Sequence, residues 1–172
     1  MRSFIAPVVV ASALAGLVAT AAPASASTAA TCAANAGVTL KPGISLTASS
    51  GTFASVRGGT IACAGTVNGT QVGGKGTLSF SGVYGTSGGD TCQKGAGSGT
   101  LTATVPKSAG GTLTIKGPFT FTRAGSVVKV SGTIAGATVA GVLQFSPAPG
   151  QTCATTKVTS ATVSGTAGLA GA

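Results

Sequence analysis

The chain almost lacks the side chains with which most enzymes move protons. Its 172 residues include one carboxylate side chain, that of Asp90, and no histidine. General acid–base catalysis depends mainly on His, Asp and Glu, and metal sites use the same groups together with Cys. The composition therefore argues against a conventional hydrolase, metalloenzyme or phosphotransferase. We expect a protein that is not an enzyme, with no catalytic residue, no cofactor and no metal ligand.

Long apolar runs are also missing, apart from one at the N-terminus that has the parts of a secretory signal peptide. Arg2 supplies the positive charge, residues 4–18 are apolar, and Ala24-Ser25-Ala26 is a small-x-small cleavage sequence. The apolar run is shorter than the roughly 20 residues that a transmembrane helix needs, and no later segment is long and apolar enough. We expect residues 1–26 to be removed on export and residues 27–172 to form one domain, secreted to the extracellular space or the cell envelope.

Acidic charge is nearly absent, so the ten basic residues give a net charge of +9. Loss of Arg2 with the signal peptide leaves +8 (nine minus one). A field of this sign attracts anionic polymers, but the other basic residues are scattered singly. They are Lys41, Arg57, Lys75, Lys94, Lys107, Lys116, Arg123, Lys129 and Lys157. Because nucleic-acid grooves show clustered basic residues interleaved with aromatic rings, we expect a solvated basic surface and no specific nucleic-acid binding.

The chain has four cysteines, Cys32, Cys63, Cys92 and Cys153. An even number in an exported protein indicates two disulfides. Metal binding needs close pairs such as C-x-x-C, whereas these cysteines are about 30 to 60 residues apart. Three pairings are possible. If eight strands run up and down in order, the loops after the 75–84 segment and before the 157–164 segment lie at the same end, which favours Cys92–Cys153 together with Cys32–Cys63.

After residue 26, apolar residues alternate with small polar ones. In one segment Leu113, Ile115 and Phe121 share a face, while Thr residues occupy the other. This period is typical of half-buried strands in an antiparallel sheet. It predicts strands at 75–84, 112–122, 126–134 and 138–145, weaker strands at 38–46, 60–67, 101–105 and 157–164, and a possible extra one at 52–56.

Glycine-rich turns separate these segments, as at Gly88-Gly89 and Gly110-Gly111. Short, regularly spaced strands indicate an all-β fold. We expect a single antiparallel domain of about eight strands, as an up-and-down barrel or a barrel-like sandwich. The segments 27–34 and 166–172 are small, polar or featureless, so we expect them to be frayed.

Several short motifs have a simpler interpretation than a functional one. Residues 69–76 nearly match a P-loop, but Gly76 stands where Ser or Thr would bind Mg²⁺ and no helix follows. Residues 95–99 are a loop or strand entry without the βαβ context of a dinucleotide site. Asn68-Gly69-Thr70 is a formal glycosylation sequon, but Asn-Gly is also a preferred hairpin pair. Asp90 is predicted to cap a turn beside a cystine.

An Ala-rich export signal is followed by the strings ACAGTVNG, GKGTLSFSGVYG, DTC, GPFTFTR and TCATTKVTSATVSGTA, which are spread over most of the mature chain. In these features the chain resembles small secreted, β-rich, disulfide-containing proteins of actinobacterial type. The resemblance implies an extracellular or envelope address. It implies no activity and carries over no functional residue.

These observations favour a secreted, non-enzymatic binding or structural protein with a basic β surface. Its partner would be an anionic cell-wall polymer or another protein. One alternative is a carrier of a small apolar ligand, which would need an apolar pocket of about 300 Å³ or more inside a barrel. Another is a protease inhibitor that presents the disulfide-braced segment 147–153.

Overall fold

The computed structural model describes residues 27–56 and 58–171, so the predicted signal peptide (1–26) and Arg57 lie outside the described residues. The described chain is built from strands and contains no helix that could cross a membrane. The strands are β1 (Thr28–Ile44), β2 (Gly51–Ser55), β3 (Thr60–Val67), β4 (Thr70–Tyr84), β5 (Lys94–Pro106), β6 (Thr112–Ala124), β7 (Val127–Ile134), β8 (Ala137–Pro147) and β9 (Val158–Gly171). The all-β prediction is confirmed.

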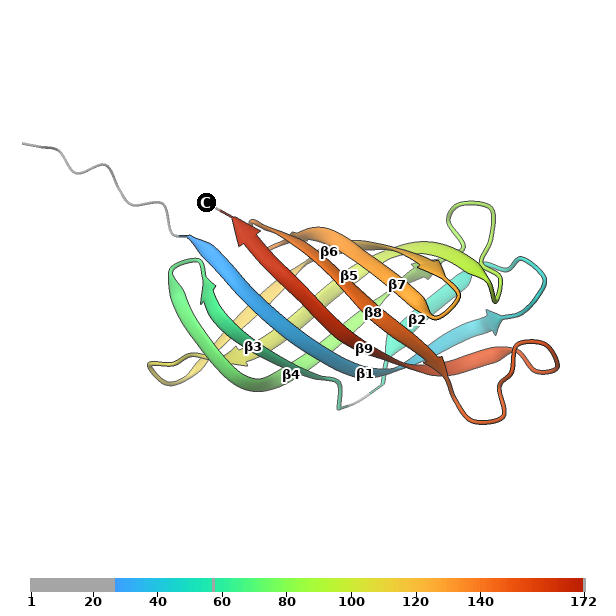
Figure 1. The fold of residues 1–172 in the computed structure, drawn as a ribbon, viewed down its shortest axis with the longest axis horizontal. Coiled ribbons are helices and arrows are strands. Elements are labelled where there is room, and N and C mark those ends of the chain that lie inside the picture. Colours follow the sequence, from blue (N-terminus) through green and yellow to red (C-terminus); the bar gives the residue numbers. More distant parts are fainter. Residues whose placement is uncertain (1–26, 57, 172) are drawn as a thin grey trace, which may run out of the picture.

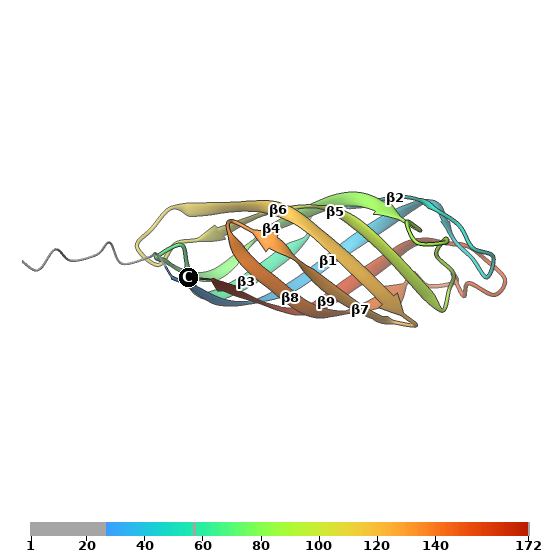
Figure 2. The same cartoon turned by 90° about the horizontal axis from the view of Figure 1, so that it is seen from above.

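The nine strands form one antiparallel sheet that closes into an elongated ring (Figures 1 and 2). From β3 to β9 each strand pairs with the next along the chain, and β9 pairs back onto β1. Strands β2 and β3 both lie between β1 and β4, β3 toward one end of the barrel and β2 toward the other. The ring thus has eight strand positions, one of them shared, and of the two predicted architectures it is the barrel.

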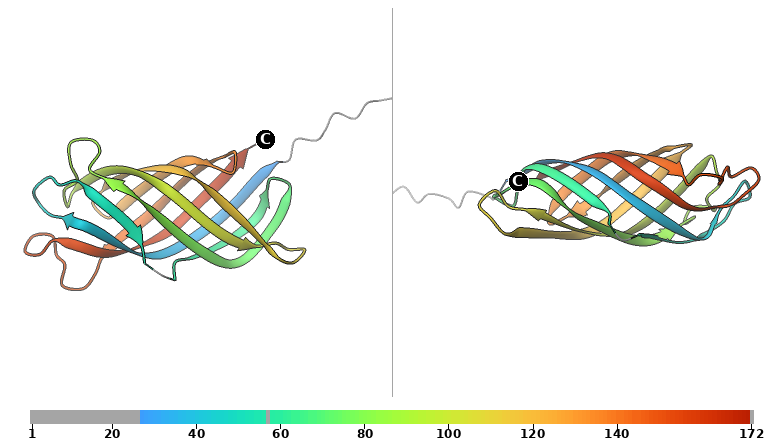
Figure 3. Two further views of the ribbon diagram at one scale, coloured as in Figure 1. Left: turned by 180° about the vertical axis from the view of Figure 1, so that it is seen from behind. Right: turned by 90° about the horizontal axis from the view of Figure 1, so that it is seen from below.

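Alternation of side chains separates the two faces of the ring, as the sequence pattern predicts. On β6, Ile115 is buried in the interior, while Lys116 and Thr120 lie on the exposed outer face. Apolar residues therefore fill the barrel, and Thr, Ser and Lys coat it. The views in Figure 3 show the strands inclined to the long axis of the barrel, as closure of a twisted sheet requires.

The prediction that the segments 27–34 and 166–172 are frayed was wrong for residues 28–34 and 166–171, and residue 172 lies outside the described residues. Strand β1 starts at Thr28 and β9 ends at Gly171, and these two residues are register partners in the seam that closes the ring. Ala30 and Leu169 are buried partners in this seam. Residues as small as Ala and Gly give little hydrophobic signal in a sequence, but they pack well where two strands cross a narrow interior.

The two ends of the barrel differ. One end, here called the turn end, has short connections, including Asn68-Gly69 between β3 and β4. Asn68 has φ 47° and Gly69 has φ 73°, the left-handed values of a type I′ hairpin turn, so the predicted hairpin is present. The other end, the loop end, carries the longer connections 45–50, 85–93 and 148–157 (Figure 1, right).

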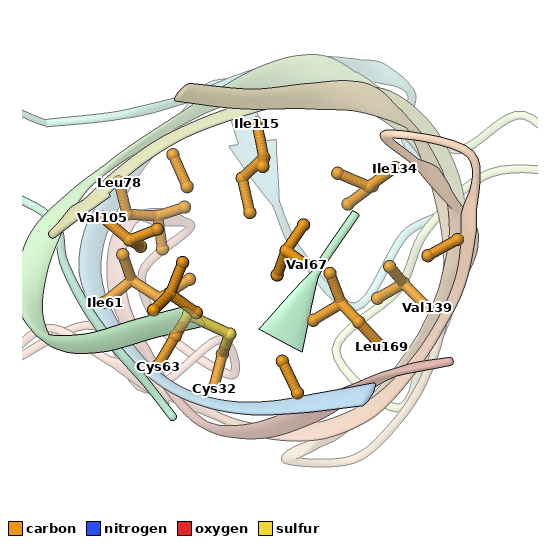
Figure 4. Close-up of a cluster of buried hydrophobic side chains, with 14 of the residues drawn as sticks. Cys32, Ile61, Cys63, Val67, Leu78, Val105, Ile115, Ile134, Val139 and Leu169 are labelled. Atoms are coloured by element: carbon orange, nitrogen blue, oxygen red, sulfur yellow. A yellow bond between two sulfur atoms is a disulfide. The ribbon is translucent and has the colours of Figure 1, made fainter. Parts of the chain in front are cut away.

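Two buried clusters fill the interior, one toward each end. In the cluster toward the turn end, side chains point to the barrel axis from strands all around the ring (Figure 4). The Cys32–Cys63 disulfide joins register partners on β1 and β3 inside this cluster. The second disulfide, Cys92–Cys153, joins two loops at the loop end. This is the pairing that the sequence ranked first.

The closing seam can be tested with Leu169→Ala. Leu169 is 6% exposed, and truncation of a buried Leu costs about 2–5 kcal/mol of unfolding free energy. Urea denaturation measures the loss. The control is Thr166→Ala, which changes an exposed side chain in the same terminal segment and should stay within about 0.5 kcal/mol of the unsubstituted protein. Equal, small effects of both substitutions would contradict the seam.

Candidate functional site

The outer surface of the barrel carries charge of one sign. Asp90, the only carboxylate side chain in the sequence, is 1% exposed, so no side chain on the described surface offsets the basic residues. The described lysines are Lys41, Lys75, Lys94, Lys107, Lys116, Lys129 and Lys157. All are exposed except Lys107, which is half-buried. The charge on the described surface is therefore positive, and four of these lysines lie on the consecutive strands β4, β5, β6 and β7.

The outer face of β6, β7 and β8 contains an open hollow of about 620 Å³, here called the outer hollow. Thr120, Ser131 and Lys129 line it, together with Val142, which is 51% exposed. The hydroxyls of Thr120 and Ser131 lie 3.1 Å apart and hydrogen-bond to each other. The outer hollow thus combines hydroxyl groups, one ammonium group and an exposed apolar side chain.

A second lysine lies close to the outer hollow. Lys129 on β7 is the register partner of Thr122 on β6, and Lys94 on β5 is the partner of Ala124, two residues further along β6. Adjacent strands lie about 4.8 Å apart, so strands β5 and β7 are separated by about 10 Å. Lys94 and Lys129, both exposed, therefore lie on the two strands that flank the end of β6.

Arg123 is not on the surface, which corrects the expectation that it is one of the scattered, solvated basic residues. It is 6% exposed and points into the loop end of the barrel. Its guanidinium donates hydrogen bonds to the main-chain oxygens of Cys92 (3.0 Å) and Gly125 (2.9 Å), and to that of Thr91. Its charged carbon lies 5.2 Å from the centre of the Phe145 ring. The sequence does contain a signal for this inward position. Side chains alternate along a strand, so residue 123 lies on the same face as Phe119 and Phe121.

Asp90 lies beside Arg123 because Gly95 leaves room for it. Gly95 is the register partner of Arg123, and a Cβ at Gly95 would overlap the Asp90 carboxylate. Asp90 Oδ1 accepts hydrogen bonds from the main-chain N–H groups of Ala96 (2.8 Å) and Gly85 (3.2 Å). The predicted turn-capping role is therefore present. Asp90 Oδ2 has no hydrogen-bond partner among the described residues.

Burial governs the electrostatics of this group. Loss of solvent raises the pKa of the Asp90 carboxyl, while the N–H group of Ala96 and the charge of Arg123 act in the opposite direction. Burial likewise raises the pKa of Tyr84, whose hydroxyl oxygen accepts a hydrogen bond from Gly43 N–H at 3.0 Å. We call Tyr84, Asp90 and Arg123 the polar cap, because they lie at the loop end of an otherwise apolar interior.

The loops hold the polar cap in place. Ser49 and Asp90 exchange two main-chain hydrogen bonds, of 2.9 and 2.6 Å, which tie connection 45–50 to connection 85–93. Cys92 N–H donates to Ser45 O at 3.0 Å, and the Cys92–Cys153 disulfide ties in connection 148–157. The segment 147–153, which the sequence suggested as a possible inhibitor loop, is therefore tied to the other connections at the loop end of the barrel.

Below the polar cap lies an apolar interior cavity of about 160 Å³. Phe53, Phe80, Phe119 and Phe121 line it and pack in tilted or edge-on pairs, with ring centres 5.6 to 6.4 Å apart. Pockets for drug-sized molecules start at about 300 Å³. The cavity is about half that size, so the expectation of a carrier for such a ligand finds no support.

The two glycine-rich motifs occupy ordinary places in the sheet. Residues 69–76 form part of the hairpin turn and the first half of β4, and residues 95–99 lie within β5. No protein-family model, curated protein or solved structure matches this chain. A functional conclusion therefore depends on the geometry of the barrel.

The raised pKa of Asp90 predicts an unusual response to acid. The folded state binds the proton of Asp90 more tightly than the unfolded chain, where the pKa is about 3.9. The free energy of unfolding should therefore increase as the pH falls from neutral through the folded-state pKa of Asp90 toward about 3.9. When the pH rises again through that pKa, this added stability is lost. Chemical denaturation at a series of pH values measures it.

Asp90→Asn is the control for this response, because it removes the only titrating carboxylate side chain. The stability of this variant should change little over the same pH range, whatever its absolute value. A wild-type protein that loses stability on acidification would show that attraction to Arg123 outweighs the burial of Asp90.

Proposed function

We propose that this protein is a secreted, non-enzymatic binding protein of the extracellular space or cell envelope that binds an acidic polysaccharide on its outer surface. The observation that carries the proposal is the burial of the only carboxylate side chain, which leaves lysine as the charge on the described surface. The two disulfides are compatible with an extracellular location.

Charge of one sign favours a polymer of the opposite sign. No acidic side chain on the described surface repels an anionic chain, and a polymer that lies across β4 to β7 meets one lysine on each of these strands. Such a field raises the local concentration of an anionic partner and its rate of association. The lysines do not form a single dense cluster, which suits a repeating polymer better than a small multiply charged ligand.

The outer hollow adds groups that suit a sugar. Pyranose rings present hydroxyls at their edges and apolar C–H groups on their faces. Thr120 and Ser131 can exchange hydrogen bonds with sugar hydroxyls, exposed Val142 can contact a ring face, and Lys129 can pair with a carboxylate. Lys94, across β6, can pair with the next charged unit. We therefore place the main contact at the outer hollow.

The absence of accessible acid–base groups supports a binding role over a catalytic one. Asp90 and Arg123 are buried beneath the connections at the loop end, and their side chains form hydrogen bonds with main-chain groups. Lysines on the described outer surface have no carboxylate or histidine beside them with which to share a proton. The surface can attract and hold a substrate-like polymer, but it has little with which to cleave it.

Binding to alginate, a soluble polymer of uronic acids, tests the proposal. Calorimetry or affinity electrophoresis should detect binding at low salt and a marked loss between about 0.01 M and about 0.15 M NaCl, where the screening length falls from about 30 to about 8 Å. Neutral dextran should not bind. Binding of alginate that does not change with salt, or no binding at all, would contradict an electrostatic polymer site.

A matched pair of variants locates the site. The double substitution Lys94→Gln with Lys129→Gln should weaken alginate binding several-fold, because the ammonium group in the outer hollow and the neighbouring one across β6 are both lost. Lys107→Gln with Lys75→Gln removes the same charge at the turn end and serves as the control. Equal losses in the two double variants would favour a diffuse field over the outer hollow.

A further inference from the structure

We propose that the interior cavity is a second binding site, for a compact, uncharged, apolar molecule of about the size of benzene. This site lies inside the barrel and is independent of the outer surface. The proposal rests on the volume of the cavity, its apolar lining and the closed ring around it.

The volume matches a small ring. The cavity measures about 160 Å³, and an apolar cavity of about 150 Å³ is large enough to hold benzene. It is too small for a drug-sized molecule, and the rings of Phe53, Phe119 and Phe121 give it flat walls that suit an aromatic or alicyclic ligand.

The lining makes the cavity a poor site for water. Apart from the polar cap, the side chains around it are apolar. In the polar cap, Arg123 donates three hydrogen bonds to main-chain oxygens, and Asp90 Oδ1 accepts two from main-chain N–H groups. A cavity water normally makes about three hydrogen bonds, which this lining does not supply. An apolar ligand would therefore displace little bound water.

The closed ring prevents the cavity from collapsing. In a barrel, the number of strands and their stagger set the diameter, so inward side chains cannot move closer by a shift of the whole sheet. Here the β1–β9 seam and the Cys32–Cys63 disulfide hold the ring closed around the cavity. Its lining lacks attractive contacts on the empty side, and a ligand of matching size would restore them.

The lining indicates a ligand without charge. Asp90 and Arg123 lie at the loop end of the cavity, but their polar atoms present almost no surface to it. Asp90 Oδ2, which has no hydrogen-bond partner among residues 27–56 and 58–171, is itself inaccessible. A charged ligand would therefore bring an uncompensated charge into an apolar site, which is costly. The ligand should be neutral and apolar, as benzene is.

Nuclear magnetic resonance titrations of the ¹⁵N-labelled, disulfide-bonded protein test this proposal with three probes of similar size. Benzene should bind with saturable shifts at residues around the cavity. Phenol should bind more weakly because the apolar lining offers its hydroxyl group no accessible partner, and benzoate should not bind because of its charge. Tighter binding of phenol than of benzene would overturn the apolar character assigned to the site, and shifts confined to the outer surface would overturn the site itself.

A pair of neighbouring substitutions provides a second test. Ala34 faces the cavity, whereas Ala33 is exposed on the outer face of the same strand. Ala34→Leu should abolish benzene binding by filling the cavity, and Ala33→Leu should leave it unchanged. Undiminished benzene binding by Ala34→Leu would overturn the proposal. The probe series on the unsubstituted protein decides the question if Ala34→Leu does not fold.

Discussion

Closure of the ring is the constraint on which the rest of this structure depends. The pairing of β9 with β1 satisfies the main-chain groups that an open sheet would leave at its edges, and it sets the width of the interior. That interior then has to be filled by inward side chains from eight strand positions. Large side chains fill the interior toward the loop end, where the phenylalanines lie. At other positions along the barrel, Ala and Gly let neighbouring strands approach closely.

A closed ring also divides the chain into an inside and an outside with different chemistry. Among the described residues, the aromatic rings and the carboxylate of Asp90 lie inside, together with Arg123. Main-chain N–H groups donate hydrogen bonds to Asp90, and main-chain oxygens accept them from Arg123. The outside keeps Thr, Ser and Lys. This division connects the two proposed binding modes, because burying Asp90 produces both an outer surface of one charge and a polar group at the end of an apolar cavity.

Local patterns predicted much of this fold. Strand β3 matches the predicted 60–67 segment, and the Asn68-Gly69 hairpin follows from the conformations that those residues favour. The disulfide pairing followed from an up-and-down order of strands, which the structure has. The prediction that Arg123 is solvated was wrong because it followed the usual behaviour of basic residues. The alternation along β6 does place residue 123 on the inward face. The ends of the chain were misjudged because Ala and Gly give a weak pattern.

By itself the sequence determined the all-β class, the alternation of inward and outward residues, and the near absence of acid–base groups, because each is a property of composition or of neighbours along a strand. Only the tertiary structure decided that residues 28 and 171 lie side by side, that Asp90 is covered next to Arg123, and that a cavity remains between the buried clusters. These depend on how strands far apart in sequence meet around a ring of limited width, and no local pattern contains that information.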